Sequence, residues 1–248
     1  MKKSMNGKVV LIVGGTGSIG AVTARDFAEL GARVAISHRD VPEEAAAAAK
    51  VAQSLPGEGH AALVSDVART DTLKALRAEI ERCYGRLDIL VNAAGFTKPV
   101  PHADLEALDD DLIDKMFAVN WRGQFATIRT FAPLLKASGD GLIVSISSIA
   151  GTNGIGSSIA YCAAKAGIDV MTKSLARVLA PEVRVLAVAP GVVDTNFVPG
   201  RGTDFNARTA AREGARTSTA RSARMKPTNP RPIRMPSYTA RVPAAKRG

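Results

Sequence analysis

The chain has few cysteine and histidine residues and no long apolar segment. Its two cysteines, Cys83 and Cys162, lack metal-ligand spacing and are typical of buried thiols rather than a disulfide. The three histidines, His38, His60 and His102, are too scattered to form a hydrolase triad or a metal site. No apolar run approaches the ~20 residues that span a bilayer, and the first eight residues contain no signal-like apolar segment. We therefore expect a soluble cytoplasmic protein without a metal site.

Positive charge is concentrated at the C-terminal end of the chain. The formal net charge is +10, yet residues 1–200 contain 21 Lys and Arg and 21 Asp and Glu. Residues 201–248 contain 12 basic residues and only two acidic ones, Asp204 and Glu213. Because the first 200 residues are neutral and the last 48 have few aromatic side chains for base stacking, nucleic acid is not expected as a partner.

The C-terminal segment also lacks an apolar pattern. Its only large aliphatic residues are Ile233 and Val242, so it cannot bury enough apolar surface to offset its conformational entropy. We therefore divide the chain into a domain of residues 1–198 and a basic, disordered or atypical tail of residues 199–248. Two origins of the tail remain open, a shifted reading frame in GC-rich DNA and a natural basic extension. Sequencing of the gene and an intact mass would decide between them.

Short Val- and Ile-rich segments alternate with helical segments along the neutral part of the chain. The alternation predicts right-handed crossovers and a Rossmann-like, doubly wound parallel sheet of about six strands with helices on both faces. The expected strands are Val9–Val13, Arg33–Ser37, Ala61–Ser65, Ile89–Asn92, Gly141–Ser147 and Arg184–Ala189. The expected helices cover approximately residues 19–30, 42–54, 70–84, 109–137 and 158–179.

A glycine-rich segment joins the first expected strand to the first expected helix. Glycines allow a tight turn, and a helix N-terminus offers free N–H groups to a pyrophosphate. This strand–turn–helix context favours a dinucleotide site rather than an ordinary turn. The expected contact residues are Gly14, Thr16, Ser18, Ile19 and Gly20.

Tyr161 and Lys165 lie four residues apart in an expected helix, so their side chains share a face. The ammonium would stabilise a phenolate and lower the pKa of the tyrosine from its usual value of about 10. A tyrosine of this kind exchanges a proton with a carbonyl or alcohol oxygen near neutral pH. Ser148 lies thirteen residues before Tyr161.

These motifs occur in an order that resembles the short-chain dehydrogenase/reductase family. The matching segments end near residue 198 and are Gly14–Gly20, Asp66-Val67, Asn92–Gly95, Asn120, Ser148, Tyr161-x-x-x-Lys165 and Pro190–Thr195. Val13 stands where the family usually has threonine, and Ser18 replaces the middle glycine of the common pattern. The glycine spacing is similar to that of larger relatives in the family.

The resemblance implies an enzyme that transfers a hydride between a nicotinamide cofactor and a carbonyl or secondary alcohol. Tyr161 would be the acid/base group, and Lys165 would also bond the nicotinamide ribose. Ser148 would donate a hydrogen bond to the substrate oxygen and stabilise the charge developing there. Asn120 would hold a water in a proton relay to the lysine; alternatively, it is a helix amide satisfied by backbone. A 3-oxoacyl thioester is the substrate suggested by the resemblance.

The resemblance also assigns cofactor contacts along the expected strand ends. Asp66 would bond the adenine amino group, with Val67 beside it, unless it only caps the next helix. The backbone around Asn92, Ala93 and Gly95 would pack under the adenine ribose. The nicotinamide carboxamide would be contacted by three residues of the segment after the last expected strand: Pro190, Val193 and Thr195.

The choice of cofactor depends on the end of the second expected strand. His38 occupies the position where an acid would select NAD, and Arg39 beside it can pair with the 2′-phosphate of NADP. We predict a preference for NADP(H), with NAD(H) as the alternative if Asp40 is the selecting acid.

In the family, a substrate lid, a further helix and a last sheet strand come after the position of residue 198. None of these is recognisable in this sequence, so the last family strand is expected to be missing. We expect a homodimer before a tetramer. An impaired or silent nucleotide-binding protein is the alternative to an active enzyme.

Overall fold

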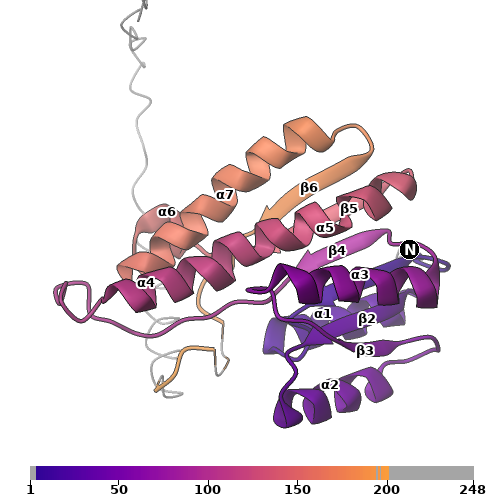
Figure 1. Ribbon diagram of the computed structural model, residues 1–248, viewed down its shortest axis with the longest axis horizontal. Helices are drawn as coiled ribbons and strands as arrows, with labels where there is room; N and C mark the ends of the chain where they lie inside the picture. Colours follow the sequence, from indigo (N-terminus) through magenta and orange to yellow (C-terminus); the bar gives the residue numbers. More distant parts are fainter. Residues whose placement is uncertain (1–3, 194, 196, 201–248) are drawn as a thin grey trace, which may run out of the picture. The chain divides into compact units, whose positions relative to one another are not determined.

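The computed structural model describes residues 4–193, 195 and 197–200 (Figure 1). Its six strands form one sheet in the order β3-β2-β1-β4-β5-β6, and every neighbouring pair is parallel. The Rossmann-like fold predicted from the sequence is therefore confirmed, with each strand end within one residue of its expected position. The strands are β1 (Val9–Val13), β2 (Arg33–His38), β3 (Ala61–Val64), β4 (Ile89–Asn92), β5 (Gly141–Ile146) and β6 (Val183–Val188).

Helices cover both faces of the sheet. One face carries α1 (Ser18–Glu29) and α2 (Pro42–Ser54), and the other carries α3 (Thr70–Tyr84), α5 (Gly123–Ala137) and α7 (Ile159–Leu179) (Figure 1). Along β1 the side chains alternate between the two cores, with Leu11 facing α3 and α5 and Ile12 facing α1. All five β1 residues are buried, which explains why the strand is apolar without alternation.

The helix expected over residues 109–137 consists of three segments. It begins as α4 (Asp110–Phe117), continues as the π-helical segment η1 (Ala118–Arg122) and ends as α5. A Cβ on Gly123 would lie 2.9 Å from Val67, so the absence of a side chain lets the helix approach the segment after β3 at this point. A four-residue helix, α6 (Ala150–Asn153), was not expected from the sequence.

The sheet is covered unevenly at β5 and β6. On the α7 side Val183 and Val185 are buried, but on the opposite side Leu186 and Val188 are 53% and 50% exposed. Within the described ranges no helix lies over that side of β6, and no seventh strand follows it. The last family strand would follow residue 198, largely outside the described residues, so its predicted absence stays a prediction. The predicted tail lies outside the described residues, apart from residues 199 and 200.

The described residues contain neither a membrane-spanning helix nor a metal-binding cluster. None of their helices has the length and apolar character needed to cross a membrane. No group of three or more His, Cys, Asp or Glu side chains in these ranges could hold a metal ion.

Candidate active site

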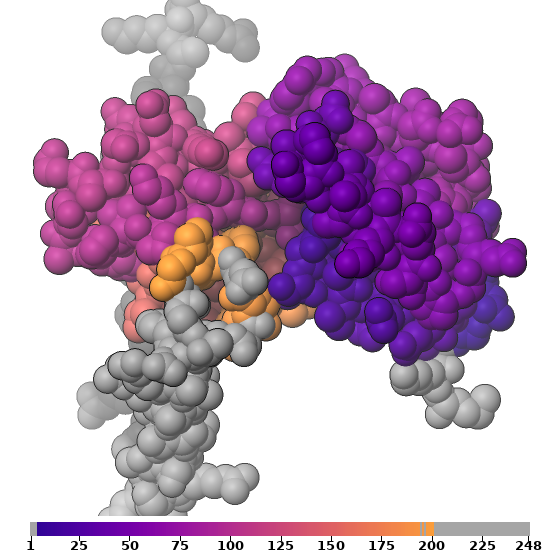
Figure 2. All heavy atoms as spheres, turned by 90° about the horizontal axis from the view of Figure 1, so that it is seen from below, coloured from indigo at the N-terminus to yellow at the C-terminus, as the bar shows by residue number. Residues whose placement is uncertain are grey.

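Two adjoining cavities lie at the edge of the sheet where the strands end. The tyrosine cavity, of about 510 Å³, is lined by Ser148, Tyr161 and Lys165 among others. The arginine cavity, of about 540 Å³, is lined by Arg39 and Asp66 among others. Figure 2 shows the surface hollowed between the purple N-terminal part and the pink part of the molecule, with orange residues between them. The two cavities have in common Thr16, Gly17, Ala93, Gly95 and Phe197.

The glycine-rich turn lies where the two cavities meet. Gly14 has a φ of 81°, and a Cβ there would lie 2.5 Å from the backbone nitrogen of Ala94. A Cβ on Gly20 would collide with the carbonyl oxygen of Gly14. Gly17 is the N-cap of α1, and no side chain caps this helix end. The turn therefore fits an anionic group bound by the backbone at the N-terminus of α1.

Tyr161 and Lys165 enter the tyrosine cavity from the first two turns of α7. The N-cap residue Ser158 is buried, and its Oγ accepts a hydrogen bond from the Tyr161 N–H at 3.2 Å. The Nζ of Lys165 lies 5.5 Å from the centre of the Tyr161 ring. The shared helix face predicted from the four-residue spacing is therefore present.

Lys165 is a charged group in a nearly enclosed position. Its residue is only 3% exposed, and its Nζ donates to the carbonyl oxygen of Ile146 at 2.7 Å. Burial lowers the pKa of the ammonium to about 8, against a smaller opposing effect of Asp169. Because this pKa is above 7, the ammonium form still predominates at neutral pH.

The two serines at the end of β5 have different environments. Ser147 is buried, and its Oγ donates to the carbonyl oxygen of Lys165 at 3.2 Å. Ser148 is half-buried in the wall of the tyrosine cavity, and its Oγ accepts a hydrogen bond from the Ala150 N–H at 3.2 Å. A hydroxyl that accepts from the backbone keeps its own proton for a second partner. Ser148 can therefore donate to a group in the cavity.

Asn120 lies behind the cavity wall and lines neither cavity. Its Nδ2 donates to the carbonyl oxygens of Phe96 and Met116 at 2.8 and 3.0 Å, and its Oδ1 accepts from the Phe96 N–H at 3.0 Å. This side chain thus holds the segment of Gly95 and Phe96 in place. Its predicted place in a proton relay stays a prediction.

Asn92, at the end of β4, also lies outside both cavities. It is buried, and neither polar atom of its side chain has a hydrogen-bond partner in the described part of the chain. The predicted cofactor role of this residue rests on its backbone and is not tested by its side chain.

The arginine cavity gathers the residues expected at the adenosine end. Asp66 lines it beside Val67, although one carboxylate oxygen of Asp66 already accepts from the Ala68 N–H at 2.8 Å. His38 is buried with its Nδ1 hydrogen-bonded to the carbonyl oxygen of Arg39 at 2.8 Å. Asp40, the alternative selecting acid, is not among the residues that line the cavity.

Glu44 and Phe197 are among the cavity residues that were not predicted from the sequence. Glu44 pairs with Arg39 from the first turn of α2. The ring of Phe197 lies 6.2 Å from that of Tyr161, near Gly95, in the same wall as the predicted Pro190, Val193 and Thr195. Phe197 follows the last motif and has no periodic pattern around it. Glu44 gave a weak signal, an acid five residues after the selecting arginine.

The fold and the cavities together define a dinucleotide-binding α/β protein with a tyrosine–lysine–serine group beside the nucleotide turn. Residues 8–204 match the short chain dehydrogenase family model. The chain therefore belongs to the short-chain dehydrogenase family of oxidoreductases, and its C-terminal residues beyond the match depart from that family. The match ends six residues after the boundary that the motifs had placed near residue 198.

Similar proteins agree with this membership. The chain is 38% identical to cis-4-hydroxycyclohexanecarboxylate dehydrogenase of Sinomonas cyclohexanicum, over 83% of this chain and 81% of that protein. It is 36% identical to the 3-oxoacyl-(acyl-carrier-protein) reductase FabG of Thermotoga maritima, over 77% and 76%. Among solved structures, the 3-ketoacyl-(acyl-carrier-protein) reductase of Brucella melitensis complexed with NADH matches with a TM-score of 0.72. That match has 31% identity over 78% of this chain and 79% of the other.

Proposed function

We propose that the protein transfers a hydride between NADP(H) and a carbonyl or secondary alcohol, with Tyr161 as the acid/base group. The observation that carries this proposal is the position of Tyr161, Lys165 and Ser148 in one cavity wall, next to the glycine-rich turn. A proton donor, a buried ammonium and a hydroxyl then face a space that adjoins a nucleotide site.

The residues present fit a dinucleotide. The turn at Gly14 and Gly20 leaves no room for side chains, and the uncapped start of α1 can bind a pyrophosphate. Asp66 and Val67 would hold the adenosine end, and Thr195 with Pro190 the other end. When bound, the nicotinamide supplies or accepts the hydride at the substrate carbon.

In the direction of reduction, the Tyr161 phenol donates its proton to the substrate oxygen as negative charge develops there. Ser148 donates a hydrogen bond to the same oxygen. The Lys165 ammonium, held by Ile146, favours the phenolate that Tyr161 becomes. In the reverse direction the phenolate accepts the proton of the alcohol.

The walls of the tyrosine cavity suggest the substrate class. Among the described residues that line it, Lys165 is the only charged one, and the others include Ile149, Ile155 and Val193. An uncharged carbonyl flanked by apolar carbon fits this lining. Because similar proteins include 3-oxoacyl-(acyl-carrier-protein) reductases, 3-oxoacyl thioesters are the first substrates to assay.

The test is oxidation of NADPH over a panel of ketones and 3-oxoacyl thioesters, with cofactor binding measured in parallel. We expect turnover in the wild type and a loss of at least about a hundredfold in Tyr161→Phe, with cofactor binding retained. If the protein binds nucleotide but turns over none of the substrates, the alternative of a catalytically silent nucleotide-binding protein is supported instead. Turnover that survives Tyr161→Phe would remove Tyr161 from the reaction.

The proposed NADP preference rests on Arg39, which lines the arginine cavity. A guanidinium pairs with a phosphate through parallel N–H donors. A higher kcat/KM with NADH than with NADPH in the wild type would refute this preference and leave the proposed hydride transfer intact.

A further inference from the structure

Arg39 is already occupied by a carboxylate in the arginine cavity. It follows β2 directly, and Glu44 lies in the first turn of α2. The Nε of Arg39 donates to Oε1 of Glu44 at 2.9 Å, and its Nη2 donates to the same oxygen. The backbone N–H of Arg39 donates to Oε2 at 3.0 Å. Both carboxylate oxygens are thus bound to a single residue.

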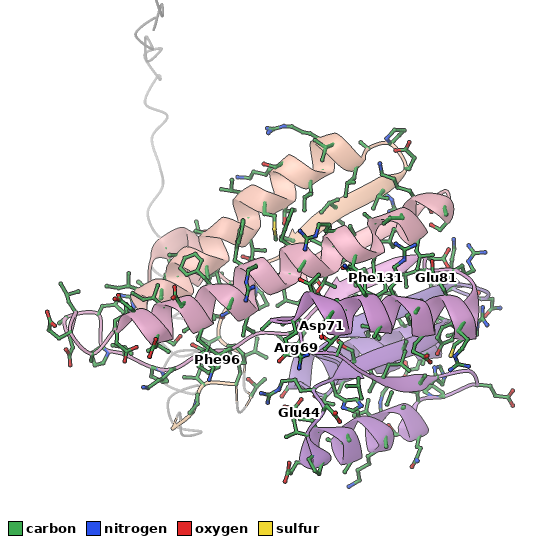
Figure 3. All side chains as sticks on the ribbon, in the orientation of Figure 1. Glu44, Arg69, Asp71, Glu81, Phe96 and Phe131 are labelled. Carbon is green, nitrogen blue, oxygen red and sulfur yellow. The ribbon has the colours of Figure 1, made fainter. Side chains whose placement is uncertain are left out.

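The pair is ionised and accessible from the cavity. Partial burial alone would raise the pKa of Glu44, but the hydrogen bonds and charge of Arg39 lower it below its usual value. The Arg39 side chain is 64% exposed and that of Glu44 28% exposed, so the guanidinium is the more accessible partner. In Figure 3 the labelled Glu44 lies at the start of α2 and Phe96 on the segment leaving β4; both residues line the arginine cavity.

The two nicotinamide cofactors differ by a 2′-phosphate that carries nearly two negative charges at neutral pH. A guanidinium carries five N–H donors, and Glu44 occupies the edge formed by Nε and Nη2 of Arg39. A 2′-phosphate that binds this edge competes with Glu44 for the same N–H groups, and the two anions also repel each other. NAD places no second anion there and leaves the ion pair undisturbed.

We propose that Glu44 is a specificity-determining residue, which limits the preference for NADP over NAD by holding Arg39 in competition with the 2′-phosphate. The inference rests on the proposed function, because it assumes that the arginine cavity holds the adenosine end of the cofactor. Glu44 acts through Arg39 and is a positioning residue rather than a catalytic one.

The test is the dissociation constant of NADP⁺ and of NAD⁺ for the wild type and Glu44→Gln, measured by calorimetry. Glutamine keeps an oxygen that can accept from the Arg39 N–H, so the β2–α2 turn is conserved. We expect NADP⁺ to bind about tenfold more tightly to Glu44→Gln, with NAD⁺ changed by less than about twofold. Glu43→Gln is the matched control, since it removes the same charge from the same helical turn outside the cavity.

The Arg39→Gln background distinguishes competition for Arg39 from simple charge repulsion between Glu44 and the 2′-phosphate. In Arg39→Gln, adding Glu44→Gln is expected to improve NADP⁺ binding by no more than about twofold. An equal gain in both backgrounds would overturn the competition, as would a Glu44→Gln protein with the selectivity of the Glu43→Gln control. Because these measurements need no turnover, their failure is distinct from loss of the proposed reaction. Adenosine 2′,5′-bisphosphate and 5′-AMP repeat the comparison without a nicotinamide.

Discussion

At the scale of single residues, Lys165 combines a function with an energetic penalty. An unfolded lysine has a pKa near 10.4, whereas burial lowers that of Lys165 to about 8. Between these values the unfolded chain binds more protons than the folded one, so the free energy of unfolding rises with pH. Below pH 8 both states are protonated and the full penalty of burying the charge is present.

We predict that Lys165→Met abolishes turnover while raising the free energy of unfolding at pH 7 by about 2 kcal/mol. A shift of this size in the lysine pKa corresponds to about 3 kcal/mol, and about 1 kcal/mol is lost with the hydrogen bond to Ile146. The variant should also lose the rise in stability between pH 8 and 10, measured by urea unfolding.

The control for this prediction is Lys173→Met, because Lys173 lies on the same helix and is exposed. This variant should keep the wild-type free energy of unfolding and its dependence on pH. A Lys165→Met protein that is less stable than the wild type at pH 7 would contradict the expected penalty.

At the scale of elements, the π-helical segment η1 connects the helix layer to the cavities. A π-helical turn adds a residue to the helix and is frequent at functional sites. Here it contains Asn120, whose amide binds both backbone groups of Phe96. Because Gly95 and Phe96 line the arginine cavity, the position of this wall depends on the helix irregularity.

Asn120→Ala is therefore expected to loosen the wall as well as to slow turnover. Leaving the buried groups of Phe96 unpaired should lower the free energy of unfolding by about 2 kcal/mol, or Tm by roughly 4–8 °C. The dissociation constant of the cofactor should rise with it, as measured by calorimetry. If Asn120 acts only in a proton relay, kcat alone will fall while Tm and cofactor binding stay at their wild-type values.

The regular elements were predictable from the sequence because their patterns are local. A buried parallel strand such as β1 reads as a continuous apolar run, and the spacing of Tyr161 and Lys165 fixes a common helix face. Gly14 has a positive φ that other residues rarely adopt, and Gly20 lies too close to the Gly14 carbonyl oxygen for a side chain. These signals gave the six strands and part of the cavity lining, including the glycine-rich turn, Ser148, Tyr161 and Lys165.

The remaining features depend on contacts that no local sequence pattern determines. The π-helical segment ends next to Gly123, which closely approaches Val67 although the two residues are far apart in the sequence. The role of Glu44 arises only when α2 folds back beside the end of β2, and its position resembles an ordinary acidic helix start. Phe197 meets Tyr161 across a turn whose path no local pattern indicates.

At the scale of the whole molecule, one side of β5 and β6 forms an open apolar strip. The register places Val144 beside Leu186 and Ile146 beside Val188, and the β6 members are half-exposed. Contiguous apolar surface of this kind promotes association in water. The expected homodimer stays a prediction.

We predict that Leu186→Thr reduces the binding of an apolar dye. It should also raise the protein concentration at which association begins, as measured by light scattering. The free energy of unfolding should change by less than about 0.5 kcal/mol, since the side chain is exposed. Val185→Thr, one residue away on the buried side, should instead lower it by about 1–3 kcal/mol through a buried hydroxyl. Equal effects of the two substitutions would show that β6 does not have one covered and one open side.

The division of the binding edge into two cavities has a consequence for how this protein can be altered. The side chains particular to the arginine cavity come mainly from residues 37–44 and 65–68, and those particular to the tyrosine cavity from residues 146–198. Under the proposed function, the preference for a coenzyme and the choice of substrate would be determined largely by separate stretches of the sequence. A chimaera joined to a relative near residue 90 would exchange residues 37–44 and 65–68 and keep residues 146–198 of the tyrosine cavity.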